Sequence, residues 1–64
     1  MTANMRDRIG GWLLKPGNTK EKLAELLGIS VGTLNNYLSG ATEPRWSMQR
    51  KLADILGCEV SDLI

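Results

Sequence analysis

Residues 19–40 read Thr-Lys-Glu-Lys-Leu-Ala-Glu-Leu-Leu-Gly-Ile-Ser-Val-Gly-Thr-Leu-Asn-Asn-Tyr-Leu-Ser-Gly. Apolar residues recur at helical spacing before and after Gly28, a residue type that readily takes the left-handed conformation that other residues avoid. Thr19 and Ser30 are preferred N-cap residues, and each stands just ahead of one of the two apolar patterns. The segment therefore predicts two helices joined by a tight turn, the second of them over residues 31–39.

The apolar residues of these two helices mark the sides expected to face a core. In the first helix they are Leu23, Ala24, Leu26 and Leu27, and in the second they are Val31, Leu34, Tyr37 and Leu38. Tyr37 admits a second interpretation, because its hydroxyl is equally suited to a phosphate contact. Gly40 is expected to end the second helix.

Three further helical segments flank this pair. Residues 4–14 carry Met5, Ile9, Trp12 and Leu13 on one face and end at Pro16-Gly17. From about Arg45 to Leu56 the residues expected to face inward are Trp46, Leu52, Ala53 and Leu56, and Gly57 terminates that helix. Residues 59–64 allow one short turn that brings Val60 and Leu63 to the core. Because no strand pattern occurs, residues 1–64 are predicted to form a single all-α domain, a compact five-helix bundle.

Composition excludes several functional classes. The chain has 64 residues, a net charge of +1 and a single cysteine, Cys58, with no histidine. An intrachain disulfide is therefore impossible, a metal site is not expected, and no nucleophile has a base at helical spacing, so we expect neither a cofactor nor an enzyme. No apolar run approaches the roughly 18 residues of a membrane span and no leader segment begins the chain, which favours a cytoplasmic protein.

Short polar side chains and one lysine occur where the two central helices begin and along the second one. A helix that enters the major groove of DNA needs hydrogen-bonding side chains at its exposed positions, and asparagine can pair bidentately with adenine. Backbone amides at a helix start favour phosphate. The candidate residues are Thr19, Lys20, Ser30, Thr33, Asn35 and Asn36, with Arg45 as a further phosphate contact. They predict binding to double-stranded DNA, in which Asn35 and Asn36 read bases and Lys20 assists.

The segment 19–40 resembles, without gaps, the helix-turn-helix of the phage repressor and Cro family. The shared landmarks are Leu23, Ala24, Leu27, Gly28, Ile29, Ser30, Leu34 and Gly40, and the similarity continues through Pro44 and residues 52–57 to Leu63-Ile64. The resemblance implies a transcriptional regulator whose third helix reads the major groove, and a homodimer on operator DNA. It assigns base contacts to Val31, Gly32, Asn35 and Asn36, with Lys20, and phosphate contacts to Thr19, Ser39 and the loop at Ala41 and Thr42.

The chain departs from the family at several contact positions. Lys20 stands where the family usually has glutamine, and Val31 and Gly32 replace polar or basic residues. Sequence-specific binding is therefore expected to be weaker, or to depend more on DNA shape. Together with the near-neutral charge and Glu43 in the contact loop, these departures also motivate an alternative function, a protein-interaction module (antirepressor or antitoxin-like) that keeps the fold with weak or no affinity for DNA. A steep loss of affinity with salt would favour the DNA-binding function.

One departure generates a structural prediction. The family often pairs arginine with glutamate between the first and third helices, where this chain has Leu13 and Leu38. Two apolar side chains that replace an ion pair are often neutral or stabilising, so we predict a Leu13–Leu38 contact. In a double-mutant cycle of Leu13→Ala and Leu38→Ala, measured by urea unfolding, the combined loss of stability should differ from the sum of the single losses. Additive losses would contradict the contact.

Overall fold

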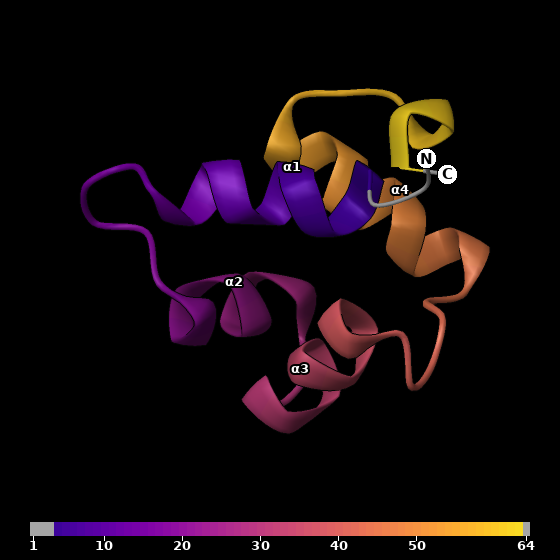
Figure 1. Cartoon of the computed structure of the whole chain (residues 1–64), viewed down its shortest axis with the longest axis horizontal. Helices are drawn as coiled ribbons and strands as arrows, with labels where there is room; N and C mark the ends of the chain where they lie inside the picture. The colour runs from indigo at the N-terminus through magenta and orange to yellow at the C-terminus, as the bar shows by residue number, and fades with distance from the viewer. Residues whose placement is uncertain (1–3, 64) are drawn as a thin grey trace.

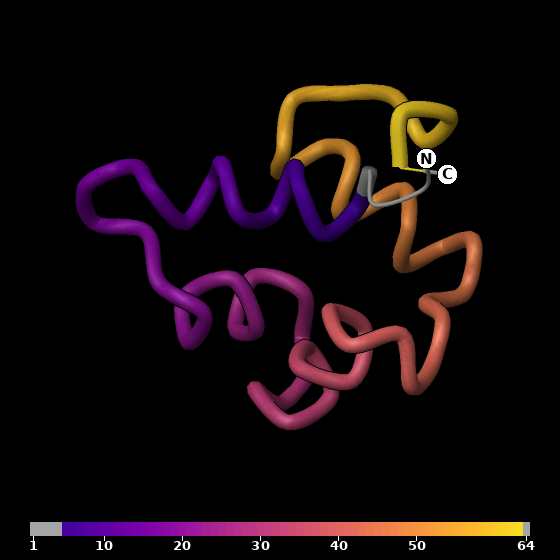
Figure 2. Tube along the Cα trace, in the orientation of Figure 1, coloured from indigo at the N-terminus to yellow at the C-terminus, as the bar shows by residue number. Residues whose placement is uncertain are grey.

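A computed structural model describes residues 4–63 of the chain (Figures 1 and 2). In chain order, its elements are α1 (Asn4–Leu13), α2 (Lys20–Leu27), α3 (Val31–Ser39), α4 (Trp46–Leu56) and the 3-10 helix η1 (Val60–Leu63). The predicted all-α class is confirmed over these residues.

The last element corrects the expected five-helix bundle, because residues 4–63 contain four α-helices. The fifth segment is one turn of 3-10 helix, in which the Asp62 carboxylate accepts a hydrogen bond from the Glu59 backbone N–H at 3.1 Å. Four residues leave little room for repeated i→i+4 hydrogen bonds, and tighter i→i+3 bonding is common in such short pieces. The turn still brings Leu63 into the core, as expected.

The core lies where the four α-helices meet. In Figure 1, α2 and α3 lie below α1 and η1 lies above it. α1 packs against α4 and η1, while α2 packs against both α3 and α4. The fully buried side chains are aliphatic, and each α-helix supplies at least one of them: Ile9, Leu23, Leu27, Leu34 and Leu52. A domain of this size buries only roughly 60% of its unfolded surface, so this small set carries much of the stability.

Two side chains that were expected to face the core are exposed. Trp46 is 63% exposed and its ring lies under the guanidinium of Arg50, 5.1 Å from the ring centroid. With about 100° of rotation per residue, Trp46 lies on a different side of α4 from Met48, which is four residues before Leu52 and packs against the core. The first turn of α4 is therefore anchored by Met48, and the expectation for Trp46 was wrong.

Leu26 is the second correction, at 51% exposed. On α2 the buried side chains Leu23, Ala24 and Leu27 define one face, and Leu26 lies about a quarter turn away from its centre. The helical spacing of the apolar residues did not show that Leu26 lies at the edge of the buried face of α2 and not at its centre.

α1 is linked to α3 by a contact that the sequence did not suggest. The Arg6 side chain donates a hydrogen bond from Nε to the backbone oxygen of Leu38 at 3.0 Å. Leu38 lies in the last turn of α3, where the carbonyl ends of a helix favour a cation. Leu13 and Leu38 are both half-buried and pack against the core, and their mutual contact stays a prediction.

The contrast between Leu34 and Leu26 yields a test of the core. Leu34→Ala removes a side chain with no exposed surface and should cost about 2–5 kcal/mol of unfolding free energy. Leu26→Ala, the matched control on a half-exposed side chain, should change it by only about 0.5 kcal/mol. Urea unfolding followed by circular dichroism measures both. Equal losses for the two variants would mean that Leu34 is not a core residue.

Candidate nucleic-acid interface

The turn between α2 and α3 is built by a left-handed glycine and a serine cap. Gly28 has φ +74°, and its N–H donates to the carbonyls of Ala24 and Glu25. The N–H of Ile29 also donates to Ala24 at 3.0 Å. Ser30 then caps α3, because its Oγ accepts a hydrogen bond from the Thr33 N–H at 3.1 Å. These bonds end one helix and begin the next within three residues, as the sequence predicted.

The two sides of α3 differ sharply in burial. Leu34 is the one fully buried side chain of this helix, and Val31, Tyr37 and Leu38 are half-buried beside it. Because each residue turns the helix by about 100°, the two positions that follow Leu34 are turned about 100° and 200° away from it. Asn35 and Asn36 are accordingly exposed, and α3 carries no charged side chain. An exposed, uncharged amide face is free to make hydrogen bonds with an external partner.

Lys20, the first residue of α2, reaches across to this face. Its Nζ donates a hydrogen bond to Oδ1 of Asn35 at 3.1 Å. Both residues are exposed. Two candidate residues that are 15 positions apart in the sequence therefore form one unit, which the spacing of the residues did not reveal.

The hydroxyl groups at the helix ends are already engaged with the backbone. Thr19 Oγ1 accepts from the Lys22 N–H at 3.0 Å, which confirms the predicted cap of α2. Ser30 Oγ also shares a hydrogen bond with Thr33 Oγ1 at 3.0 Å. Ser39 Oγ donates to the Asn36 carbonyl at 3.2 Å, so its proton is held within the C-terminal turn of α3.

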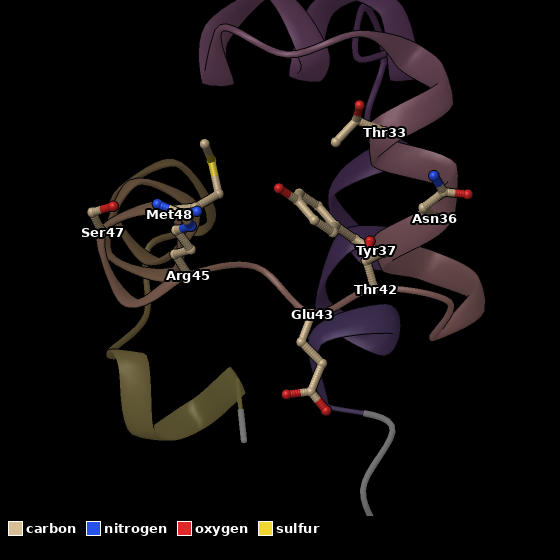
Figure 3. Close-up of a pocket in the computed structure, with 8 residues that line it drawn as sticks. All are labelled: Thr33, Asn36, Tyr37, Thr42, Glu43, Arg45, Ser47 and Met48. Carbon is tan, nitrogen blue, oxygen red and sulfur yellow. The ribbon is translucent and has the colours of Figure 1, made fainter.

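A surface groove of about 350 Å³ separates α3 from the start of α4 (Figure 3). Its lining residues are Thr33, Asn36, Tyr37, Thr42, Glu43, Arg45, Ser47 and Met48. The Tyr37 ring projects from α3 toward the start of α4 (Figure 3). The Tyr37 residue is half-buried and lines the groove, and the contact of its hydroxyl with a phosphate stays a prediction.

Most of the candidate residues lie on the accessible surface. The exposed ones are Thr19, Lys20, Ser30, Gly32, Asn35, Asn36, Ser39, Thr42 and Arg45, and the half-buried ones are Val31 and Thr33. Val31 packs against the core, so only part of its side chain is available. A Cβ added at Gly32 would meet only Ser30 Oγ, at 3.7 Å, which leaves the backbone at the start of α3 open to close approach.

Sequence reasoning missed Ser47 and Met48 as groove residues. Met48 has a usable signal, because it stands four residues before the core residue Leu52 and so belongs to the inner side of α4. Ser47 has none, since its position beside the groove depends on the path of residues 40–45. That path includes hydrogen bonds from the N–H groups of Ala41 and Thr42 to the Asn36 carbonyl, at 3.0 and 3.4 Å.

Residues 4–63 hold neither a group of metal-ligating side chains nor a helix suited to cross a membrane. No three His, Cys, Asp or Glu side chains in this range lie together as metal ligands would. None of the helices in the described part of the chain is both long enough and apolar enough to cross a membrane.

The chain matches a known protein family. A family model described as helix-turn-helix covers residues 12–63 of the chain, which includes α2, α3, α4 and η1. Comparisons with curated proteins and with solved structures give no match.

The cap at Ser30 is a testable part of this interface. Ser30→Ala removes the acceptor for the Thr33 N–H and should lower the unfolding free energy by about 0.5–2 kcal/mol. Ser30→Asn restores a capping acceptor and should recover most of that loss. Thermal unfolding of the three proteins checks this, and a stability loss for Ser30→Asn as large as that for Ser30→Ala would contradict the capping role.

Proposed function

Because the chain belongs to the helix-turn-helix family of the phage repressor and Cro type, we propose that it binds double-stranded DNA sequence-specifically as a transcriptional regulator. In this proposal α3 enters the major groove, and the protein acts in the cytoplasm. The family is a DNA-binding one, and the proposal adds which residues of this chain make the contacts.

The observation that carries the proposal is the exposed amide face of α3. Asn35 and Asn36 are exposed, about 100° and 200° around α3 from its buried residue, Leu34. Amide side chains can donate and accept hydrogen bonds at base edges in the major groove, and the absence of carboxylates on α3 avoids repulsion from the phosphates. Val31 and Gly32 begin the same helix and would lie closest to the groove floor.

Phosphate contacts would flank this face on both sides. Arg45 and Thr42 border the groove between α3 and α4, and both are exposed. At the other side, Thr19 stands at the start of α2, where backbone amides and the helix dipole favour a phosphate. Contacts of this kind fix the register of α3 on the duplex, while base contacts supply sequence preference.

We further propose that two copies bind together on DNA. A homodimer would put two α3 helices into successive major grooves, about 34 Å apart along the duplex. A near-neutral chain with few basic residues at its contacts gains affinity from such pairing, because two weak half-site interactions act together.

Selection of bound duplexes from a randomised pool, at a stated salt concentration, tests the proposal directly. A regulator should enrich a two-fold symmetric site, and its affinity for that site should fall steeply with added salt. Failure to bind any duplex at low ionic strength would overturn DNA binding. A salt-insensitive complex with another protein would then support the protein-interaction alternative.

Substitutions at Asn36 and Arg45 should have different effects, because Asn36 is proposed to contact bases and Arg45 to contact phosphates. Asn36→Ala should lower affinity for the selected site by about 5- to 150-fold, equivalent to 1–3 kcal/mol, and leave binding to unrelated duplexes nearly unchanged. Arg45→Gln should weaken binding to all duplexes and reduce the slope of log affinity against log salt by about 0.9. Fluorescence anisotropy titrations at several salt concentrations measure both effects. A uniform loss for Asn36→Ala would contradict base reading.

A further inference from the structure

The hydrogen bond between Lys20 and Asn35 changes what this surface can recognise. We propose that the two side chains act as one reader, in which the Asn35 NH₂ group and the Lys20 ammonium donate hydrogen bonds to the same base, and that this reader selects guanine in the major groove. The inference rests on the proposed function, because it concerns which base the DNA-binding face prefers. It differs from the sequence-based expectation that Asn35 pairs with adenine and that Lys20 merely assists.

The orientation of the Asn35 amide follows from elementary chemistry. A lysine ammonium carries three donors and no acceptor, so the amide atom that lies 3.1 Å from Lys20 Nζ must be the oxygen. The NH₂ group of Asn35 is therefore at the other end of the amide, directed away from the ammonium. One of the three ammonium protons is used in this bond, and two remain available to a ligand.

The helices that carry Lys20 and Asn35 place the two residues near each other, and the carboxylates nearest in sequence, Glu21 and Glu25, stand on α2 beside Lys20. α3 contains no acidic residue, and both partners stand on helices that pack against each other. α2 and α3 are further fixed by the turn at Gly28 and the cap at Ser30. The relative position of Lys20 and Asn35 is thus set by the packed part of the domain, although both side chains are exposed.

This donor pattern disfavours adenine. Bidentate pairing of asparagine with adenine needs the amide oxygen to accept from the adenine amino group. Here that oxygen already accepts from Lys20, and the positive ammonium would lie beside an amino group that also donates. The second lone pair of the Asn35 oxygen could still accept from adenine, but the ammonium would then face the adenine amino group, and two donors that face each other repel, which weakens the adenine pair.

The same pattern fits guanine. In the major groove guanine presents two acceptors, N7 and O6. Adenine presents one acceptor and one donor, thymine presents one acceptor, and cytosine presents one donor. The Asn35 NH₂ group and the Lys20 ammonium can each donate to one acceptor of this edge. Guanine is therefore the base whose edge satisfies both side chains and leaves no donor opposed to a donor.

Base selection with two lysine variants tests the reader. The wild-type chain and Lys20→Met are each used to select duplexes from a randomised pool at the same low salt concentration. We expect the wild type to prefer guanine over adenine at one position of each half-site by about 5- to 150-fold, the range that corresponds to one good base contact. Lys20→Met frees the Asn35 oxygen, so the preference at that position should shift to adenine while the rest of the site is unchanged.

Lys22→Met is the matched control. Lys22 is an exposed lysine on the same helix, so this variant loses the same charge without removing the hydrogen bond to Asn35. It should weaken binding to all sequences alike and keep the guanine preference. Replacement of the selected guanine by 7-deazaguanine removes the N7 acceptor and should cost the wild type several-fold in affinity.

The outcomes separate this inference from the proposed function. If no duplex binds, DNA binding itself fails. If duplexes bind but the wild type prefers adenine, or if Lys20→Met keeps the guanine preference, the proposed Lys20–Asn35 reader is wrong and DNA binding stands. A loss of guanine preference in Lys22→Met as large as in Lys20→Met would show a general effect of charge and would also overturn the reader.

Discussion

The burial of Leu34 is the constraint on which the rest of the interface depends. It is the one fully buried side chain of α3, and it belongs to the same core as Leu23, Leu27 and Leu52. Leu34, with Val31 and Leu38 packed against the core beside it, decides how this nine-residue helix is rotated about its own axis. The exposed amides, the backbone opening at Gly32 and the contact to Lys20 all follow from that rotation, although none of them contributes to the core.

Much of the fold could be predicted because the residues that begin and end short helices are close to one another in the sequence. The caps at Thr19 and Ser30 and the left-handed turn at Gly28 depend on neighbouring residues only, and all three are present. The errors arose where a position depends on what lies opposite. Trp46 is apolar and lies in a helix, yet the first turn of α4 has no core to meet on that side. The last element, Val60–Leu63, is too short for an α-helix. The apolar residues Val60 and Leu63 predict that this segment faces the core, but they do not predict whether it is an α-helix or a 3-10 helix.

The site could be predicted less completely than the fold. Exposure of Asn35 and Asn36 follows from helical geometry once Leu34 is assigned to the core, so the amide face was accessible to sequence reasoning. The Lys20–Asn35 hydrogen bond was not, because it depends on how closely α2 and α3 pack and on the reach of a long side chain. The groove beside Tyr37 also depends on the path of a loop that carries little sequence signal.

The hydrogen bond from Arg6 to the Leu38 carbonyl has a consequence for protein engineering. Arg6 precedes the segment 12–63 that the family model matches, yet it holds the C-terminal turn of α3. Transplanting α2 and α3 into another scaffold would keep every candidate base contact but would lose the hydrogen bond from Arg6 to the Leu38 carbonyl. A chimera that is meant to keep the same docking angle therefore needs an arginine in the equivalent place on the host's own N-terminal helix.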